Sequence, residues 1–179
     1  LPRLREAGFR WLGLGIEAGS AKVRDEQDKS ITEEEIFATI EECRKYDVSV
    51  GANYIFGLPE DDDETMLATL DLAKTLNTEY ANFYCAVAYP GSELYGEALH
   101  NGWALPYSWD GYSQFARSFL PLRTKHLSAR EVLSFRDRAF NEYFESPSYL
   151  RMVAKRFGDK AVAHIKAMTA RKLERDLLK

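Results

Sequence analysis

The sequence predicts an α/β protein in which three strand–helix units are followed by a helical segment. Three apolar runs, at residues 9–19, 48–59 and 80–91, are each followed by a stretch with helical character. The units repeat at a spacing of about 30–40 residues, as expected for parallel strands joined by helical crossovers. Three units alone leave long strand edges unpaired, so we expect them to form part of a larger barrel.

The first unit begins with residues 2–8, which have the character of the last turns of a helix that stops at Gly8. Residues 9–19 follow as a strand, and their near-continuous apolar character indicates a strand covered on both faces. Ser20 is placed to cap a short helix over residues 21–27.

The next two units carry clear helix signals. Thr32 is an N-cap and Glu35, three residues later, completes a capping box. After the second strand, residues 60–77 form a helix whose acidic first turn complements the helix dipole. After the third strand, residues 92–102 form a short helix that stops at Gly102.

The character of the chain changes after residue 102. Residues 103–127 are aromatic and irregular, and we expect these rings to pack over the end of the barrel. Ser128 and Glu131 form a capping box at the start of an amphipathic helix, and two further helices follow, divided at Gly158 and running to the carboxyl terminus. We therefore divide the chain into residues 1–102, a barrel segment, and residues 103–179, an aromatic connecting segment with a helical carboxyl-terminal extension.

Composition excludes several classes of protein. The chain has 179 residues, 45% of them hydrophobic, and a net charge of −4, so no overall attraction to nucleic acid or anionic membranes is expected. No apolar run approaches the roughly 20 residues that a membrane span needs. The cysteines, Cys43 and Cys85, lie far apart and are expected in the core, which suits a reducing cytoplasm. The three histidines are scattered, so we expect no metal bound wholly by this chain.

Polar residues at strand ends are the candidate functional groups, because function in parallel α/β folds gathers at the carboxyl ends of strands. Glu17 ends a buried strand, where a carboxylate is costly without a partner. A bound cation or a pair of ribose hydroxyls would supply one; alternatively Glu17 caps the next helix or pairs with Lys22 or Lys29. Asn53, on the second strand, either contacts a ligand or satisfies backbone groups of a neighbouring strand.

Two further patterns have simpler explanations. Residues 57–59, Gly-Leu-Pro, form a turn after the second strand. The acidic run at residues 61–64 could hold a metal, but an acidic helix start explains it better.

Taken together, these segments resemble the carboxyl-terminal half of the radical S-adenosylmethionine (radical SAM) barrel. "GLGIEAGSAKVRDEQDKSITEEEI" is similar to the fourth-strand motif of that superfamily, and "AVAYPGSELYGEALHNGW" is similar to its sixth strand and exit. "NYIFGLPEDDDETMLATLDLA" is similar to the fifth strand: Ile55, Gly57 and Glu60 fall on its Gly-x-Ile-x-Gly-x-x-Glu pattern, while Asn53 stands in place of the first glycine. The resemblance implies three βα units of a partial (β/α)6 TIM-like barrel, followed by an α-helical extension.

The resemblance also assigns roles to residues. It implies that a first group binds S-adenosylmethionine, at its ribose and methionine end or along its adenosine: Glu17, Ser20, Asn53, Ile55 and Gly57. It places a second group near a small-molecule substrate: Tyr89, Pro90 and Gly91.

One motif of the superfamily does not occur in this sequence. The loop Cys-x-x-x-Cys-x-x-Cys, which holds a [4Fe–4S] cluster, is missing. The expectation is therefore a fragment that contributes one wall of the site in a parent containing S-adenosylmethionine and the cluster, with the amino-terminal half of the same chain as its partner. The carboxyl-terminal segment is similar to that of the subgroup with a cobalamin-binding domain, which includes anaerobic magnesium-protoporphyrin monomethyl ester oxidative cyclases and methyltransferases.

Two alternatives remain open from the sequence. The first is a complete non-redox half-barrel lyase or aldolase in which Lys29 or Glu17 is catalytic. The second is a binding module that has lost the cluster. An exposed barrel edge would also allow self-association.

Overall fold

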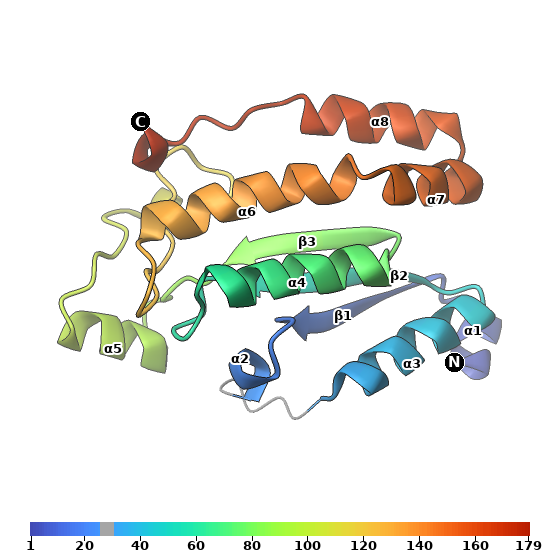
Figure 1. The fold of residues 1–179 in the computed structure, drawn as a ribbon, viewed down its shortest axis with the longest axis horizontal. Coiled ribbons are helices and arrows are strands. Elements are labelled where there is room, and N and C mark those ends of the chain that lie inside the picture. The colour runs from blue at the N-terminus through green and yellow to red at the C-terminus, as the bar shows by residue number, and fades with distance from the viewer. Residues whose placement is uncertain (26–30) are drawn as a thin grey trace.

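The computed structural model describes residues 1–25 and 31–179, and an open sheet of three parallel strands lies at its centre (Figure 1). The strands are β1 (Trp11–Glu17), β2 (Ser49–Phe56) and β3 (Tyr80–Cys85), and they are hydrogen-bonded in the order β1-β2-β3. Both strand pairs are parallel. The predicted α/β class, with three successive strand–helix units, is confirmed.

Except for the last one, the helices begin and end close to the predicted positions. They are α1 (Pro2–Glu6), α2 (Ala21–Asp25), α3 (Glu33–Lys45), α4 (Asp63–Leu76), α5 (Glu93–His100), α6 (Ala129–Phe144), α7 (Pro147–Phe157) and α8 (Asp159–Thr169), with short 3-10 turns η1 (Trp109–Tyr112) and η2 (Asp176–Leu178). The two predicted capping boxes, Thr32 with Glu35 and Ser128 with Glu131, are both present.

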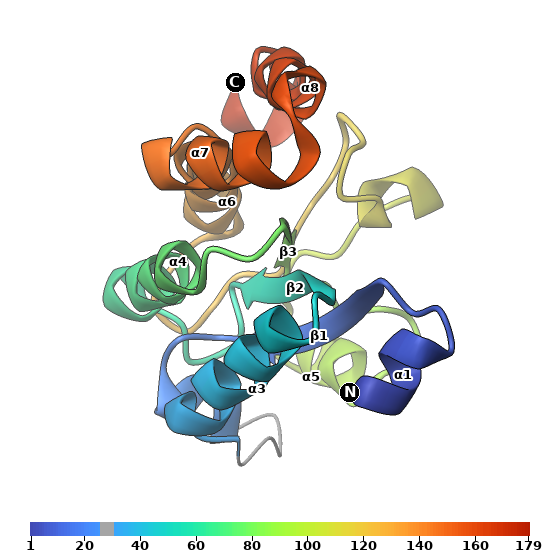
Figure 2. The same cartoon turned by 90° about the vertical axis from the view of Figure 1, so that its right-hand side faces the viewer.

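Helices cover one face of the sheet and extend past the β3 edge. Figure 2 shows α3 and α4 beside β2, α6 beyond β3, and α8 outermost. On β2 every second side chain is buried, as expected where one face of a strand packs on helices: Val50, Ala52, Tyr54 and Phe56.

The core is shared between the sheet and the carboxyl-terminal helices. Phe83 on β3 stacks on Tyr54 and Phe56 of β2, with ring centroids 5.4 and 5.7 Å apart. Phe83 also meets Tyr143 of α6 edge-on at 5.4 Å, so the aromatic packing is continuous from β2 into α6. The helical extension therefore belongs to the same core as the strands, and the division at residue 102 remains a prediction.

The strand β1 is less buried than its sequence predicts. Of its seven residues only Ile16 is buried, whereas Gly13 and Gly15 are exposed. Gly13 pairs with Gly51, and Gly15 pairs with Asn53, so this face of the sheet carries little side-chain bulk. The expectation that both faces of β1 are covered is wrong for the described residues, because the apolar run owes part of its character to glycines that bring no side chain to bury.

The last predicted helix also ends earlier than expected. Helix α8 stops at Thr169, and the following chain runs back over α6 toward the carboxyl end of β3 (Figure 1). Arg175 in this segment is buried and donates to Asp137 of α6 and to the backbone carbonyls of Gln114 and Ala116. These bonds require an extended tail, so tertiary contacts override the helical propensity of residues 170–175.

None of the helices within residues 1–25 and 31–179 combines the length and apolar character that crossing a bilayer requires.

Candidate functional site

Glu17 lies at an irregularity of the sheet. Along β1, Gly15 pairs with Asn53 but Glu17 pairs with Tyr54, so one extra residue is accommodated between them. Glu17 also has a positive φ of 66°, a conformation that costs a non-glycine residue about 1–2 kcal/mol. A bulge of this kind redirects a side chain, and strained backbone is concentrated at functional sites.

The turn after Glu17 is held from two sides. The Gly19 amide donates to the Thr69 hydroxyl of α4 at 2.8 Å, and a Cβ at Gly19 would lie 2.5 Å from the Ala68 carbonyl oxygen. Arg24, only 3% exposed, donates from Nη1 to the carbonyls of Ala18 and Gly19, each at 2.8 Å. These contacts fix the turn against α4 and maintain the strained conformation of Glu17. Ser20 follows directly and precedes α2.

Asn53 forms a side-chain hydrogen-bond chain across the sheet. Its Nδ2 donates to the Leu14 carbonyl on β1 at 3.2 Å, and its Oδ1 accepts from Nδ2 of Asn82 on β3 at 2.8 Å. The structure therefore shows the alternative role considered for Asn53, satisfying a neighbouring strand. Asn82 was not among the predicted site residues, although a second asparagine in an apolar strand was a usable signal.

Ile55 lies among the segments that leave the three strands. It packs against a small buried cluster, separate from the main core, that comprises Ala18, Val23, Leu58 and Ala86. Ala18 follows β1, Leu58 follows β2 and Ala86 follows β3, whereas Val23 belongs to α2. Ile55 thus joins the Glu17 turn to the other strand ends, at the edge where the sequence placed the site.

Gly57 is required by packing within the chain. Its φ is +81°, and a Cβ there would lie 2.5 Å from Cγ1 of Val132 on α6. Asp61, 1% exposed, accepts from the amides of Gly57 and Leu58 at 2.9 and 3.0 Å. Burial raises the pKa of Asp61. The acidic run is a helix start, as predicted, with Asp62 as the N-cap of α4; the turn-closing role of Asp61 was missed.

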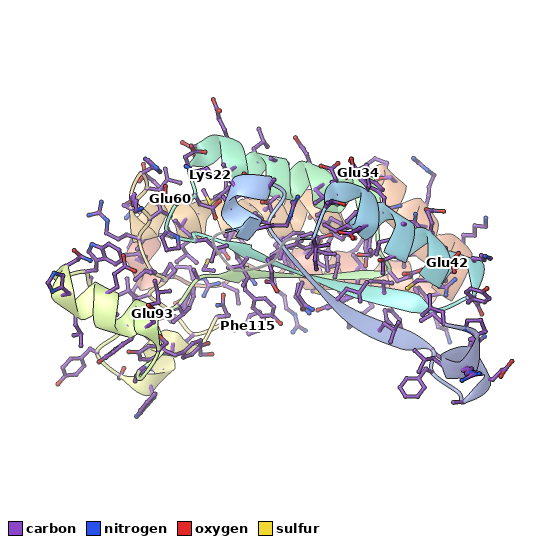
Figure 3. The ribbon with its side chains drawn as sticks, turned by 90° about the horizontal axis from the view of Figure 1, so that it is seen from below. Lys22, Glu34, Glu42, Glu60, Glu93 and Phe115 are labelled. Atoms are coloured by element: carbon purple, nitrogen blue, oxygen red, sulfur yellow. The ribbon has the colours of Figure 1, made fainter. Side chains whose placement is uncertain are left out.

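Glu60 joins three segments near the same strand ends. It accepts from Lys22 of α2 at 3.4 Å and forms a second ion pair with Lys125, which precedes α6. Figure 3 shows Lys22 and Glu60 side by side, at the start of α2 and before α4. Lys22 is thus a partner of Glu60.

The predicted substrate-side residues lie on an exposed turn before α5. Tyr89 and Pro90 are exposed, and Gly91 has a positive φ of 89°. The Tyr89 ring stacks on Tyr112 with centroids 5.8 Å apart, and Tyr112 meets Trp109 at 5.7 Å.

The aromatic segment is therefore only partly buried. Phe119 is in the core, but Tyr107, Trp109 and Phe115 are exposed. The expectation that these rings pack over the barrel end is wrong for these three side chains, because each keeps most of its surface exposed.

The described residues offer no iron–sulfur ligand set. Among residues 1–25 and 31–179, no three His, Cys, Asp or Glu side chains group closely enough to hold a metal ion. Cys43 and Cys85 are buried as predicted, and burial raises the pKa of both thiols, that of Cys85 to about 12. Buried, protonated thiols do not suit cluster ligation. Lys29 lies outside the described residues.

The strand ends are suited to holding a polar small molecule. Glu17 brings a carboxylate on a fixed turn, the chain of asparagine amides lies on the neighbouring strands, and the glycine-rich face of β1 and β2 leaves room above the backbone. Carboxylates and amides in this arrangement bind hydroxyl and ammonium groups.

Comparison with known proteins supports a family relationship. Residues 1–73 match the model of the Radical SAM superfamily. The chain is 25% identical, over 147 residues, to "Uncharacterized methyltransferase PH0819" of Pyrococcus horikoshii, covering 82% of this chain and 31% of the relative. It is 30% identical, over 97 residues, to "Anaerobic magnesium-protoporphyrin IX monomethyl ester cyclase" of Rubrivivax gelatinosus, covering 54% of this chain and 18% of the relative.

A solved structure is also similar. Coproporphyrinogen III oxidase (HemN) from Escherichia coli, a radical SAM enzyme, has a TM-score of 0.46 and 21% sequence identity, over 62% of this chain and 33% of that chain. The chain spans less than a third of the length of each curated relative. The residues that match the Radical SAM superfamily model contain the parallel pair β1 and β2 and most of α4, so this part of the chain is similar to that superfamily.

Proposed function

We propose that this chain supplies one wall of the S-adenosylmethionine and substrate site in a longer radical SAM enzyme. The observation that supports this most is the conformation of Glu17. Glu17 has a positive φ at a bulge near the carboxyl end of β1, and this residue lies within the part of the chain that matches the superfamily. Such strain is maintained where a side chain must be aimed.

The residues at the strand ends have separate tasks in this proposal. Glu17 and Ser20 hold the ribose and methionine end of the cofactor, and Asn53 and Ile55 lie along the adenosine. Gly57 lies at the same edge, although the lack of space for a Cβ beside Val132 already explains why this residue is a glycine. When bound to a [4Fe–4S] cluster, S-adenosylmethionine supplies radical chemistry; this chain's residues orient it and exclude water.

The substrate is a small molecule bound near Tyr89, Pro90 and Gly91. The two curated relatives carry the names of a methyltransferase and of a cyclase, so methyl transfer and oxidative cyclisation are the reaction classes we propose. A cobalamin-binding domain elsewhere in the longer protein and a cytoplasmic location complete the proposal.

The test replaces Glu17 in the full-length protein that contains this chain. We expect Glu17→Gln to weaken S-adenosylmethionine binding about tenfold or more, measured by isothermal titration calorimetry on the reconstituted protein. Glu17→Gly should weaken it equally while leaving the fold intact, because glycine adopts the positive φ without strain.

The matched control is Glu34→Gln, on the exposed surface of α3 (Figure 3). It should leave the affinity unchanged. If both Glu17 variants fold, as judged by thermal unfolding, and bind the cofactor as the parent does, Glu17 has no role at the ribose end.

A further inference from the structure

A cavity of about 520 Å³ lies on the far side of β3 from Glu17. It is bounded by the edge of β3, by α6 and by the carboxyl-terminal segment that follows α8. Its apolar walls include Tyr84, Phe115, Phe140, Met168 and Leu173. Small-molecule sites in proteins typically have volumes of about 300–1,000 Å³, with mainly apolar walls and a few fixed polar groups.

Arg136 is a fixed polar group in this cavity. It is 5% exposed, its Nε donates to the Phe83 carbonyl at 2.8 Å, and its Nη1 donates to Asp137 at 2.9 Å. Its guanidinium carbon lies 5.8 Å from the Phe115 ring centroid and 5.5 Å from that of Phe140. Nη2 makes no hydrogen bond to any residue the structure describes. The bonds of Nε and Nη1 therefore fix the orientation of the guanidinium before a ligand binds, and Nη2 can donate to that ligand.

The charge around the cavity favours an anion. Its lining contains four cationic side chains, Arg136, Arg138, Arg171 and Lys172, and one carboxylate, Asp137. Asp137 is paired with Arg136 and with Arg175, and Arg138 is paired with Glu142 at 3.5 Å, so the lining keeps a net positive charge to which Arg171 and Lys172 contribute. A cationic cavity in a chain with a net charge of −4 is a local feature and does not follow from overall composition.

The edge of β3 adds backbone groups to the floor of the cavity. The Gln114 side chain bonds both the amide and the carbonyl of Cys85, at 3.1 and 3.0 Å, so these groups point away from β2. Because backbone groups alternate in direction along a strand, the Phe83 amide and both groups of Ala81 point the same way. Ala81 and Phe83 line the cavity.

We propose that this cavity binds a small apolar or aromatic molecule that carries a carboxylate, with Arg136 as the anchor of the anionic group. A planar guanidinium with a free donor edge matches a carboxylate, and Arg171 and Lys172 attract it at the rim. The aromatic walls receive the apolar part. Asn82 of the lining also bonds Asn53 of the proposed cofactor site. Arg136 and the aromatic walls take no part in that site, so this proposal does not depend on it.

The experiment uses the purified 179-residue chain and two matched probes, naphthalene-1-carboxylate and the neutral naphthalene-1-carboxamide. Calorimetric titration should give saturable binding of the carboxylate, about tenfold or more tighter than that of the amide. Ser134→Trp places a large ring in the cavity from the exposed face of α6 and should weaken carboxylate binding about tenfold. The double variant Arg171→Glu and Lys172→Glu should weaken it severalfold, with less dependence on salt.

Lys160→Glu is the control, because Lys160 lies on α8 outside the cavity lining. This substitution reverses one charge, as each of the two substitutions in the double variant does. It should bind the carboxylate as the parent chain does. Equal affinity for the two probes, or carboxylate binding that Ser134→Trp leaves unchanged, would overturn the proposal. So would light scattering that shows a dimer dissociated by Ser134→Trp, because the cavity would then be an interface between copies.

Discussion

Asn82 on β3 donates a 2.8 Å side-chain hydrogen bond to Asn53 on β2, and Asn53 in turn donates one to the Leu14 carbonyl of β1. Three parallel strands are thus joined by side chains as well as by their backbone ladders. The pair is half-buried and lies on the face of the sheet that the helices leave open.

The amide pair should contribute measurably to stability. Asn53→Ala and Asn82→Ala are each expected to lower the free energy of unfolding by about 1 kcal/mol, because each removes a partner from a partly buried polar group. The double variant should lose less than the sum, with a coupling energy of about 0.5–1.5 kcal/mol in urea denaturation. Strict additivity would mean that the two amides do not interact in solution.

Gly57→Ala should be strongly destabilising. The methyl group would meet Val132 at 2.5 Å at a residue with φ +81°, and we expect a loss of about 2–4 kcal/mol. In a Val132→Ala background the same substitution should cost only about 1–2 kcal/mol, because the steric conflict is gone.

Gly96→Ala, in helix α5, is the matched control for Gly57. A Cβ at Gly96 meets nothing within 4 Å, so this change should stabilise the protein by about 0.5–1 kcal/mol. Equal effects at Gly57 and Gly96 in chemical denaturation would contradict the packing of Gly57 on α6.

Two buried tyrosines should respond in opposite ways to loss of the hydroxyl. Tyr54 is fully buried and its hydroxyl has no hydrogen-bond partner among the described residues, so Tyr54→Phe should stabilise the fold by about 1 kcal/mol. The Tyr143 hydroxyl donates to the Thr78 carbonyl at 2.8 Å, so Tyr143→Phe should cost about 1 kcal/mol. Thermal unfolding of the two variants measures the contrast; loss of stability in both would show that Tyr54 has a partner.

Asp61 should give the protein an unusual dependence on pH. Burial raises the pKa of Asp61 above its ordinary value of 3.8, so the folded protein binds this proton at a higher pH than the unfolded chain does. The contribution of Asp61 to stability therefore increases as the pH falls from about 7 toward about 4, the opposite of a salt-bridged carboxylate.

The measurement compares the parent with Asp61→Asn across that pH range. Other carboxylates, such as Asp47 and Asp110, have lowered pKa values and titrate alike in both proteins, so the difference isolates Asp61. The parent should gain stability relative to the variant at the acidic end. A constant difference would mean that Asp61 titrates normally.

The elements of the fold could be predicted because their signals are local. Capping residues at Thr32 and Ser128 marked two helix starts, and the alternation of strands and helices fixed the parallel sheet. The end of α8 could not be predicted in this way. The segment after Thr169 is extended because Arg175 reaches Asp137, a contact between residues that are distant in sequence.

The sequence predicted the positions of the candidate site residues more fully than their contacts. Glu17 and Asn53 do lie at or near the carboxyl ends of neighbouring strands, as the strand pattern implied. The bulge, the positive φ of Glu17 and the buried Arg24 that holds its turn depend on three-dimensional packing, and the sequence carries no local signal for them. The cavity beside β3 was missed for the same reason, since it forms only when the tail returns to α6.

The sharing of one core between the sheet and α6 has a consequence for biosynthesis. Phe135, Tyr143 and Tyr149 belong to the same buried cluster as the aromatic side chains of β2 and β3. While the ribosome is still adding residues 103–149, the nascent strands therefore lack the surface that buries them. We expect the emerging chain to stay sensitive to proteases, and dependent on chaperones, until α6 and the start of α7 have left the exit tunnel.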